Sequence, residues 1–259
     1  MRPRARFILL SFAQIPVVLF VMPYLMILAI RGLEGLLGMG PAFPPPWNGV
    51  AFALASAWGA VWMSWSIYYI HAAGQGGPAE AAGKGIRPTV HLMRGGPYAF
   101  CRNPMMHGYT VAFPVGLGFL LRSWAVFIFV PLWLGLVHVF LTRVEEPELE
   151  RRFGDEYREY RAGLPRLMLR MRGARARLAA ARHELAAVGP KSPAGLALAG
   201  VLWVLWVVSL VRYLPSIAAG SAAALDILSW LPLLLHLTWY GFNLIITVFS
   251  LGALPRFEK

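Results

Sequence analysis

The chain has 259 residues and a formal net charge of +12; 58% of its residues are hydrophobic and only 14% are charged. A soluble domain carries about a quarter charged residues, whereas long uncharged apolar blocks here indicate bilayer spans. The single cysteine, Cys101, excludes an internal disulfide framework and paired-cysteine metal sites. The basic residues show neither a nucleic-acid-binding motif nor basic–aromatic alternation. We therefore expect no nucleic acid partner and interpret the charge as a surface facing anionic lipid.

The first predicted span runs from about Phe7 to Ile30 and contains two prolines. Neighbouring groups in a membrane can satisfy the carbonyls that proline frees, so we expect kinks and not a break. The apolar run is longer than that of a cleaved signal and lacks a following small-residue cleavage site, which indicates a retained helix. After a Gly/Pro-rich turn, the second span runs from Trp47 to about His71, and Trp58, Trp62 and Trp65 share one face of it.

A Gly/Pro-rich connection over residues 74–88 leads to spans three and four, Met105 to Leu121 and Ser123 to Thr142. So short a connection between these spans forces an antiparallel helical hairpin. Glycines within the third span allow another helix to approach closely. The last two spans are expected from about Ala194 to Val211 and from about Ile227 to Ser250.

The stretch between spans four and five is predicted to face water. Residues 143–192 hold 12 of the 24 Lys and Arg, and residues 145–159 hold seven of the 12 Asp and Glu. Within this stretch, Arg172 to Ala187 predicts a basic amphipathic helix on the membrane surface. With the N-terminus inside, 21 of 24 basic residues face the cytoplasm, and only Arg31, Arg122 and Arg212 fall outside. The expected fold class is all-α: a polytopic transmembrane protein of about six spans with both termini cytoplasmic.

Two polar segments flank the predicted hairpin. Residues 94–108 read RGGPYAFCRNPMMHG and lead into span three, and residues 145–166 read EEPELERRFGDEYREYRAGLPR and leave span four. Because the two spans form a hairpin, both segments must lie together at its cytoplasmic end. A charge at the end of a membrane helix is costly without a partner, so Glu145 and Glu146 are candidates to hold an ammonium group.

The other polar groups of these segments suit a zwitterionic amino-acid tail joined to an adenosine. Arginine can bind a carboxylate through two hydrogen bonds, tyrosine rings can receive an adenine or a sulfonium cation, and glycine lets the backbone approach a ligand. The candidates are Arg102, Arg143 and Arg166; Tyr98, Tyr109, Tyr157 and Tyr160; and Gly95, Gly96 and Pro97.

Both segments resemble the signature of the isoprenylcysteine carboxyl methyltransferase and phospholipid N-methyltransferase superfamily of membrane enzymes. The matching residues are Gly96, Pro97, Tyr98, Arg102, Pro104 and Gly108, followed by Glu145, Glu146, Leu149, Phe153, Gly154, Tyr157, Tyr160, Pro165 and Arg166. The resemblance covers about residues 84–170. It implies that S-adenosylmethionine binds at the cytoplasmic end of the hairpin and that a lipophilic substrate enters from the bilayer.

The resemblance also implies individual roles. Glu146, together with Glu145, would hold the amino group of the cofactor; Arg102 and Arg166 would bind carboxylates; Tyr157 and Tyr160 would shape the pocket. Two positions depart from the pattern: Asn103 replaces the family's His, and Met106 replaces its following Tyr. Asparagine cannot act as a base, and His107 or Tyr109 lies close enough in sequence to substitute. The expected catalytic residues are Arg102, Asn103 and Arg143, and the expected cofactor-binding residues are Gly96, Pro97, Tyr98, His107, Glu145, Glu146, Tyr157, Tyr160 and Arg166.

Three further residues have weaker indications. Cys101 adjoins Arg102, which would lower the pKa of its thiol. His138 lies one turn before the two glutamates and is a candidate to line a substrate tunnel, while His236 is expected to be buried within span six. No two histidines have metal-ligand spacing, so no metal site is expected.

These observations predict S-adenosylmethionine-dependent methylation of a lipophilic acceptor, with a carboxylate or thiol favoured over an amine because Asn103 leaves no evident base. The alternative is a non-catalytic membrane subunit that keeps the fold as a scaffold; a pocket filled by Phe100, Met105 and Met106 would favour it. We divide the chain into two spans and a linker (1–83), the methyltransferase-like core (84–170), a surface helix (171–192) and two C-terminal spans (193–259), which offer a docking or dimer surface. The Ala-, Gly- and Arg-rich composition indicates a bacterial inner-membrane protein.

Overall fold

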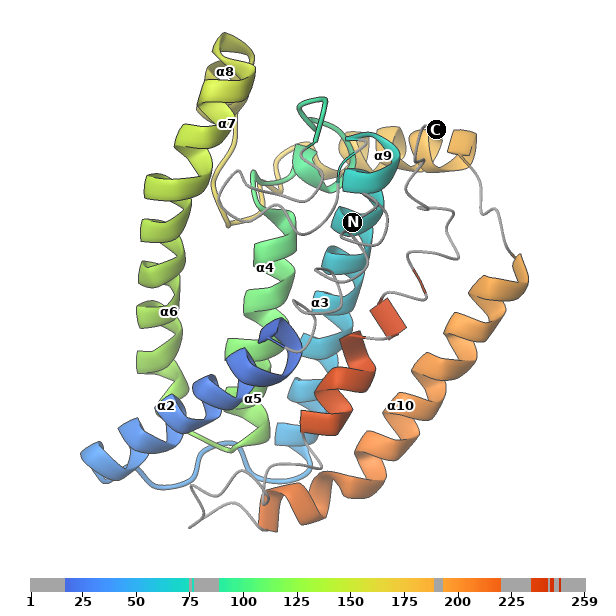
Figure 1. Ribbon diagram of the computed structural model, residues 1–259. Coiled ribbons are helices and arrows are strands. Elements are labelled where there is room, and N and C mark those ends of the chain that lie inside the picture. The colour runs from blue at the N-terminus through green and yellow to red at the C-terminus, as the bar shows by residue number, and fades with distance from the viewer. Residues whose placement is uncertain are drawn as a thin grey trace, which may run out of the picture.

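The computed structural model describes residues 17–74, 76, 89–188, 193–219, 234–241, 243–244 and 247 (Figure 1). Over these residues the chain is helical and contains no β-strand, which confirms the all-α prediction. The predicted connection over residues 74–88 and the first residues of span one lie mostly outside this description.

The described helices follow the predicted order along the chain. They are η1 (Val17–Val21), α2 (Met22–Leu37), α3 (Trp47–Ala72), η2 (Gly96–Ala99), α4 (Pro104–Thr110), η3 (Val111–Val115), α5 (Gly116–Leu120), α6 (Val126–Phe140), η4 (Leu141–Glu145), α7 (Glu146–Phe153), α8 (Asp155–Gly163), α9 (Ala174–Val188) and α10 (Pro193–Ala219). The run from α4 to α5 and the run from α6 to α7 are each continuous, with one π-helical turn inside.

Among the residues that the structure describes, three helices are long and apolar enough to cross a membrane by length and composition: Val17–Leu37, Trp47–Ile70 and Val126–Phe153. Ala197–Ser209 within α10 is a shorter apolar helix. The expected total of six spans therefore stays a prediction, as does the cytoplasmic position of the termini. The first helix corrects one boundary, because it continues seven residues past Ile30. Arg31, expected outside the span, lies within α2 and pairs with Glu34 one turn later at 2.5 Å.

The helical hairpin is confirmed. α5 ends at Leu120, α6 begins at Val126, and the intervening turn is closed by a hydrogen bond from Ser123 N to Gly118 O of 3.0 Å. Figure 1 shows α4 and α5 descending and α6 and α7 returning to the opposite end of the molecule. Residues 94–103 and 145–166 consequently meet at one end, where α8 and α9 also lie.

The hairpin packs on α3 with backbone close to backbone. A Cβ added to Gly59 would lie only 2.4 Å from Ala112 Cβ and 2.7 Å from Gly108 O. This confirms the close approach predicted for glycines of span three and identifies α3 as the partner. Phe52, Phe113 and Leu117, all at most 1% exposed, fill the core beside this contact.

The C-terminal helices attach to α3 and to one another through polar groups. Tyr240 donates to Ser56 O at 2.7 Å, and Ser209 Oγ lies 2.9 Å from Nε2 of His236. His236 is buried as expected, at 8% exposed. Helix α9 covers nearly the residues of the predicted surface helix and runs across the end of the bundle (Figure 1).

Candidate functional site

The two motif segments are joined by backbone hydrogen bonds. Arg102 N donates to Pro165 O at 3.0 Å, Asn103 N donates to Arg166 O at 3.1 Å, and Arg170 N donates to Phe100 O at 2.8 Å. These bonds fix residues separated by more than sixty positions against each other. The prediction that both segments lie together at one end of the hairpin is confirmed.

A buried charge cluster lies at this junction. Glu146 is 4% exposed, and Arg166 donates to it twice, from Nε at 2.7 Å and from Nη2 at 2.9 Å. Arg102 Nη1 lies 2.7 Å from the same carboxylate. Two guanidinium groups on one carboxylate offset the cost of burying its charge and leave the cluster with one excess positive charge.

His138 extends this cluster toward the membrane. Its Nδ1 lies 2.6 Å from Nη1 of Arg166. Arginine can only donate, so the imidazole nitrogen is the acceptor in this contact. His138 is therefore exposed on α6 and engaged with the charge cluster, and it lines neither of the two cavities described below.

The role that the resemblance implies for Glu146 changes in this geometry. Both of its oxygens receive guanidinium donors, so the carboxylate is occupied by the protein itself. Its neighbour Glu145 is half-buried and lines a cavity on the adjacent face of the helix. Glu145 thus lines the cavity, whereas Glu146 fixes the position of Arg102 and Arg166.

The cavity beside Glu145 has a volume of about 110 Å³. Its wall combines half of the predicted site residues with further polar and apolar side chains: Ile70, Thr89, His91, Leu92, Met93, Tyr98, Arg102, Asn103, Met105, Met106, Glu145, Glu148, Leu149, Arg152, Phe153, Tyr157 and Tyr160. Arg102 Nε is buried and has no hydrogen-bond partner among the described residues. The lining includes the carboxylate of Glu145, the guanidinium of Arg102 with an unused donor, and three tyrosines, groups that can bind a zwitterion attached to an aromatic group.

The segment Thr89–Arg94 closes one side of this cavity, and sequence reasoning did not assign it a role. Arg152 donates to Thr89 O, and Arg94 Nη2 donates to Glu156 O at 2.9 Å and lies 3.2 Å from its carboxylate. These contacts join positions about sixty residues apart, so no local spacing in the sequence indicates them.

The tyrosines of the site are held as neutral phenols. Burial, reinforced by the nearby Glu146 carboxylate, raises the pKa of Tyr157 to about 12, although Arg102 acts in the opposite direction. Burial also raises the pKa of Tyr160, whose hydroxyl donates to Tyr98 O at 2.8 Å. Cys101 contradicts the expectation of a lowered thiol pKa, because burial outweighs Arg102 and raises it to about 12.

Besides Glu146 and Arg166 of the charge cluster, four predicted residues lie outside this cavity. A Cβ on Gly96 would lie 2.4 Å from the Tyr69 ring, so its glycine permits a close protein contact and not a ligand contact. Pro97 is buried beside it in η2. His107 accepts a hydrogen bond from Trp58 Nε1 at 3.0 Å and faces α3, so the geometry does not favour a cofactor contact for it. Arg143 is exposed on η4 and lines neither cavity.

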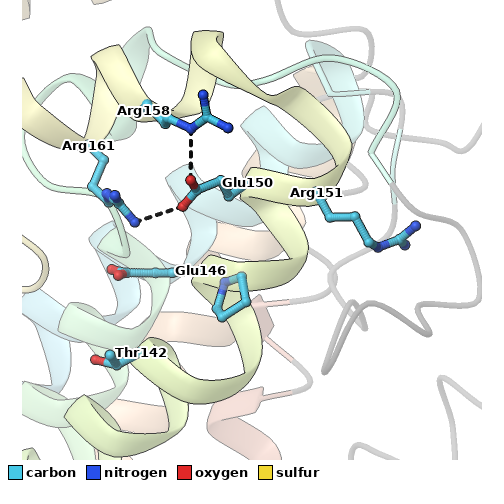
Figure 2. Close-up of a pocket in the computed structure, with 7 residues that line it drawn as sticks. Thr142, Glu146, Glu150, Arg151, Arg158 and Arg161 are labelled. Carbon is cyan, nitrogen blue, oxygen red and sulfur yellow. Dashed lines mark hydrogen bonds and ion pairs between the residues drawn. The ribbon is translucent and has the colours of Figure 1, made fainter.

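A second, open hollow of about 360 Å³ lies on the other side of Glu146 (Figure 2). Glu150 accepts from Arg158 at 2.8 Å and from Arg161 at 2.9 Å, while Arg151 extends away from the other labelled residues. Gly154, at φ 53°, allows the reversal between α7 and α8 that brings these arginines back over Glu150. The hollow is thus lined by groups that already form ion pairs, and they fix α8 on α7.

Residues 47–156 match the family model of the phospholipid methyltransferases. The match begins at the first residue of α3 and ends within α8, so it covers α3, the hairpin and Glu145–Glu146. No curated protein and no solved structure shows significant similarity to the chain. These residues therefore form a domain of the membrane methyltransferase group, as the two motif segments predicted.

Proposed function

We propose that this membrane methyltransferase uses S-adenosylmethionine to methylate a lipophilic acceptor dissolved in the bilayer. The observation that carries the proposal is the cavity in which Glu145, the unused Nε donor of Arg102 and three tyrosines converge. These groups complement an ammonium, a carboxylate and an aromatic or sulfonium group, respectively. When bound, the cofactor would supply an electrophilic methyl group.

Each residue of the chain then has a distinct role. Glu145 would hold the amino group, and Arg102 would bind the carboxylate while Glu146 keeps its guanidinium in place. Because their pKa values lie far above neutral, Tyr157 and Tyr160 stay protonated and add no negative charge to compete for that carboxylate. The protein contributes mainly by positioning and by excluding water from a cationic donor.

The acceptor that fits this cavity is one that already carries a nucleophilic anion. Asn103 lines the cavity where the family has a histidine, and an amide cannot remove a proton from an ammonium group. Met105 and Met106 supply apolar wall beside it. A carboxylate or thiolate at the end of an apolar chain meets both conditions.

Binding also requires movement of one wall. Ligand pockets usually measure about 300–1,000 Å³, and this cavity measures about 110 Å³. The segment Thr89–Arg94 forms one wall and is attached to α7 and α8 through Arg152 and Glu156. We propose that it moves outward to admit the cofactor and then closes over it.

The scaffold alternative predicts that apolar side chains fill the cavity. Phe100 instead packs on Trp62 and Trp65, with ring centroids 5.6 and 6.0 Å apart. Met105 and Met106 line the cavity without filling it. This arrangement supports the enzymatic proposal over the scaffold.

Two measurements on the detergent-purified full chain test the proposal. Calorimetry is expected to show micromolar binding of S-adenosylmethionine and S-adenosylhomocysteine; absence of binding by folded protein would favour the scaffold. Incubation with methyl-labelled donor and a bacterial lipid extract is expected to label carboxyl or thiol lipids. Asn103→His is expected to add amine lipids to the products by restoring a base. Labelling of amine lipids alone by the native protein would refute the acceptor assignment.

A further inference from the structure

The charge of the segment after α8 is not balanced within the chain. Residues 167–183 contain five arginines and no acid. Arg151, Arg158 and Arg161 of α7 and α8, by contrast, pair with Glu148, Glu150 and Asp155. Among the described residues, Arg172 and Arg175 have no ion-pair partner. The excess of positive charge is therefore concentrated in one short stretch.

Large apolar side chains are exposed in the same stretch. Met168, Met171 and Leu178 are 68%, 62% and 52% exposed, and the exposed Arg172 and Arg175 lie between Met171 and Leu178 in the chain. We call these five residues the Arg172 surface. The expected amphipathic helix is thus only partly observed, because arginines and apolar side chains share the exposed side of α9 and its preceding turn.

The opposite side of this segment is fixed to the site. Arg177 lies over the Phe100 ring at 5.8 Å and donates to Arg170 O at 2.6 Å, while Arg170 N donates to Phe100 O. Ala181 is buried at 2% exposed. These contacts hold α9 across the end of the bundle, in the orientation of a helix that lies along a membrane surface (Figure 1).

We infer that the Arg172 surface binds anionic phospholipid headgroups of the leaflet at this end of the protein. Guanidinium groups bind phosphate through paired hydrogen bonds, and neighbouring methionine and leucine side chains enter the apolar region beneath the headgroups. A nucleic acid or an acidic protein would satisfy the arginines but would leave three exposed apolar side chains without an apolar partner. The bilayer supplies both, at the level where the membrane helices end.

Lipid binding at this surface has a consequence for the site, and this consequence rests on the proposed function. The segment that carries the Arg172 surface also supplies the carbonyls of Pro165 and Arg166 to Arg102 and Asn103. Headgroups that order the segment would thereby hold Arg102 in its binding position. Anionic lipid is expected to raise the affinity for S-adenosylhomocysteine.

The test uses the full chain in nanodiscs of phosphatidylcholine, with or without phosphatidylglycerol. Hydrogen exchange of residues 167–181 is expected to slow several-fold when phosphatidylglycerol is present, and salt is expected to reduce the effect. The double variant Arg172→Gln/Arg175→Gln is expected to lose the slowing by phosphatidylglycerol, whereas Arg172→Lys/Arg175→Lys retains most of this slowing. Arg212→Gln, an exposed arginine at the opposite end, is the matched control and should behave as the native chain.

Exchange that is equal in the two lipid compositions would overturn the inference. Equal slowing by RNA or an acidic polypeptide in phosphatidylcholine discs would overturn the assignment to lipid. The exchange measurement does not involve the cofactor, so it stands even if the proposed function fails. If exchange slows but S-adenosylhomocysteine binds with equal affinity in both kinds of disc, only the coupling to the site is refuted.

Discussion

Glu145 and Glu146 are adjacent in sequence, and their substitution by glutamine is expected to have opposite consequences. Glu146→Gln removes the carboxylate that lies between two buried guanidinium groups, with contacts of 2.7, 2.7 and 2.9 Å. Glu145→Gln removes a carboxylate that lines the cavity. The first variant should lose stability, and the second should lose affinity for the cofactor.

The magnitudes follow from the burial of each group. Removing one partner of a buried ion pair costs about 3–5 kcal/mol, and the amide oxygen of glutamine keeps one acceptor, so we expect about 3 kcal/mol for Glu146→Gln. For a chain of this size that loss lowers the melting temperature by about 6–12 °C. Glu145→Gln should leave the melting temperature nearly unchanged and weaken S-adenosylhomocysteine binding about tenfold, or 1.4 kcal/mol.

Tryptophan-fluorescence melting and calorimetry of the detergent-purified variants measure both quantities. Glu159→Gln, which removes an exposed acid from α8, is the control and should change neither. Calorimetry of Glu146→Gln is done well below its melting temperature, so that lost folding is not read as lost affinity. A stable Glu146→Gln protein without affinity, beside Glu145→Gln with native affinity, would refute the assignment and restore the role that the resemblance implies.

Three further substitutions probe the packing around the site. Tyr160→Phe keeps the ring but leaves Tyr98 O without its donor; a loss of about 1 kcal/mol is expected in thermal melting, and an unchanged melting temperature would contradict it. Cys101, 0% exposed with a pKa raised from 9.0 to about 12, should resist maleimide at pH 8 until the protein unfolds. Because the pKa of this thiol is raised on folding, its contribution to the free energy of unfolding is fully present below pH 9 and declines as the pH rises toward 12. Cys101→Ala should reduce that decline. Gly59→Ala should lower the free energy of unfolding by about 1–3 kcal/mol or more, because its Cβ meets backbone of the hairpin. Gly135→Ala is the control: a Cβ there meets nothing within 4 Å, so the change should be neutral or slightly stabilising.

The helical order and the hairpin were predictable because they depend on local composition. Two apolar spans joined by so short a connection can only be antiparallel. The sequence therefore predicted that residues 94–103 would lie beside residues 145–166. The end of α2 was not predictable in this way. Arg31 interrupts the apolar run, but Glu34 follows it by one helical turn and pairs with it, so the helix continues.

The division of roles within the site depended on contacts that a sequence does not show. Both glutamates fit the same motif, and only the packing of Arg166 onto one face of the helix distinguishes them. The close approach of α3 at Gly59 and the contact between Arg152 and Thr89 likewise join distant positions. His107 lies close in sequence to Asn103 and was therefore a candidate to replace the family's histidine, but the helix turns its side chain toward Trp58.

The charge cluster and Asn103 together favour one class of acceptor. Two arginines with one buried glutamate leave excess positive charge next to the cavity, and that charge stabilises an anionic nucleophile while opposing an ammonium group. Asn103, held by its backbone to Arg166, adds a neutral amide at the same place. An enzyme that methylated amines would need the opposite arrangement, with a base to accept a proton and no excess cation beside it. The loss of the family's histidine is therefore consistent with retained catalysis on an acid, because an acceptor that is already ionised requires no base.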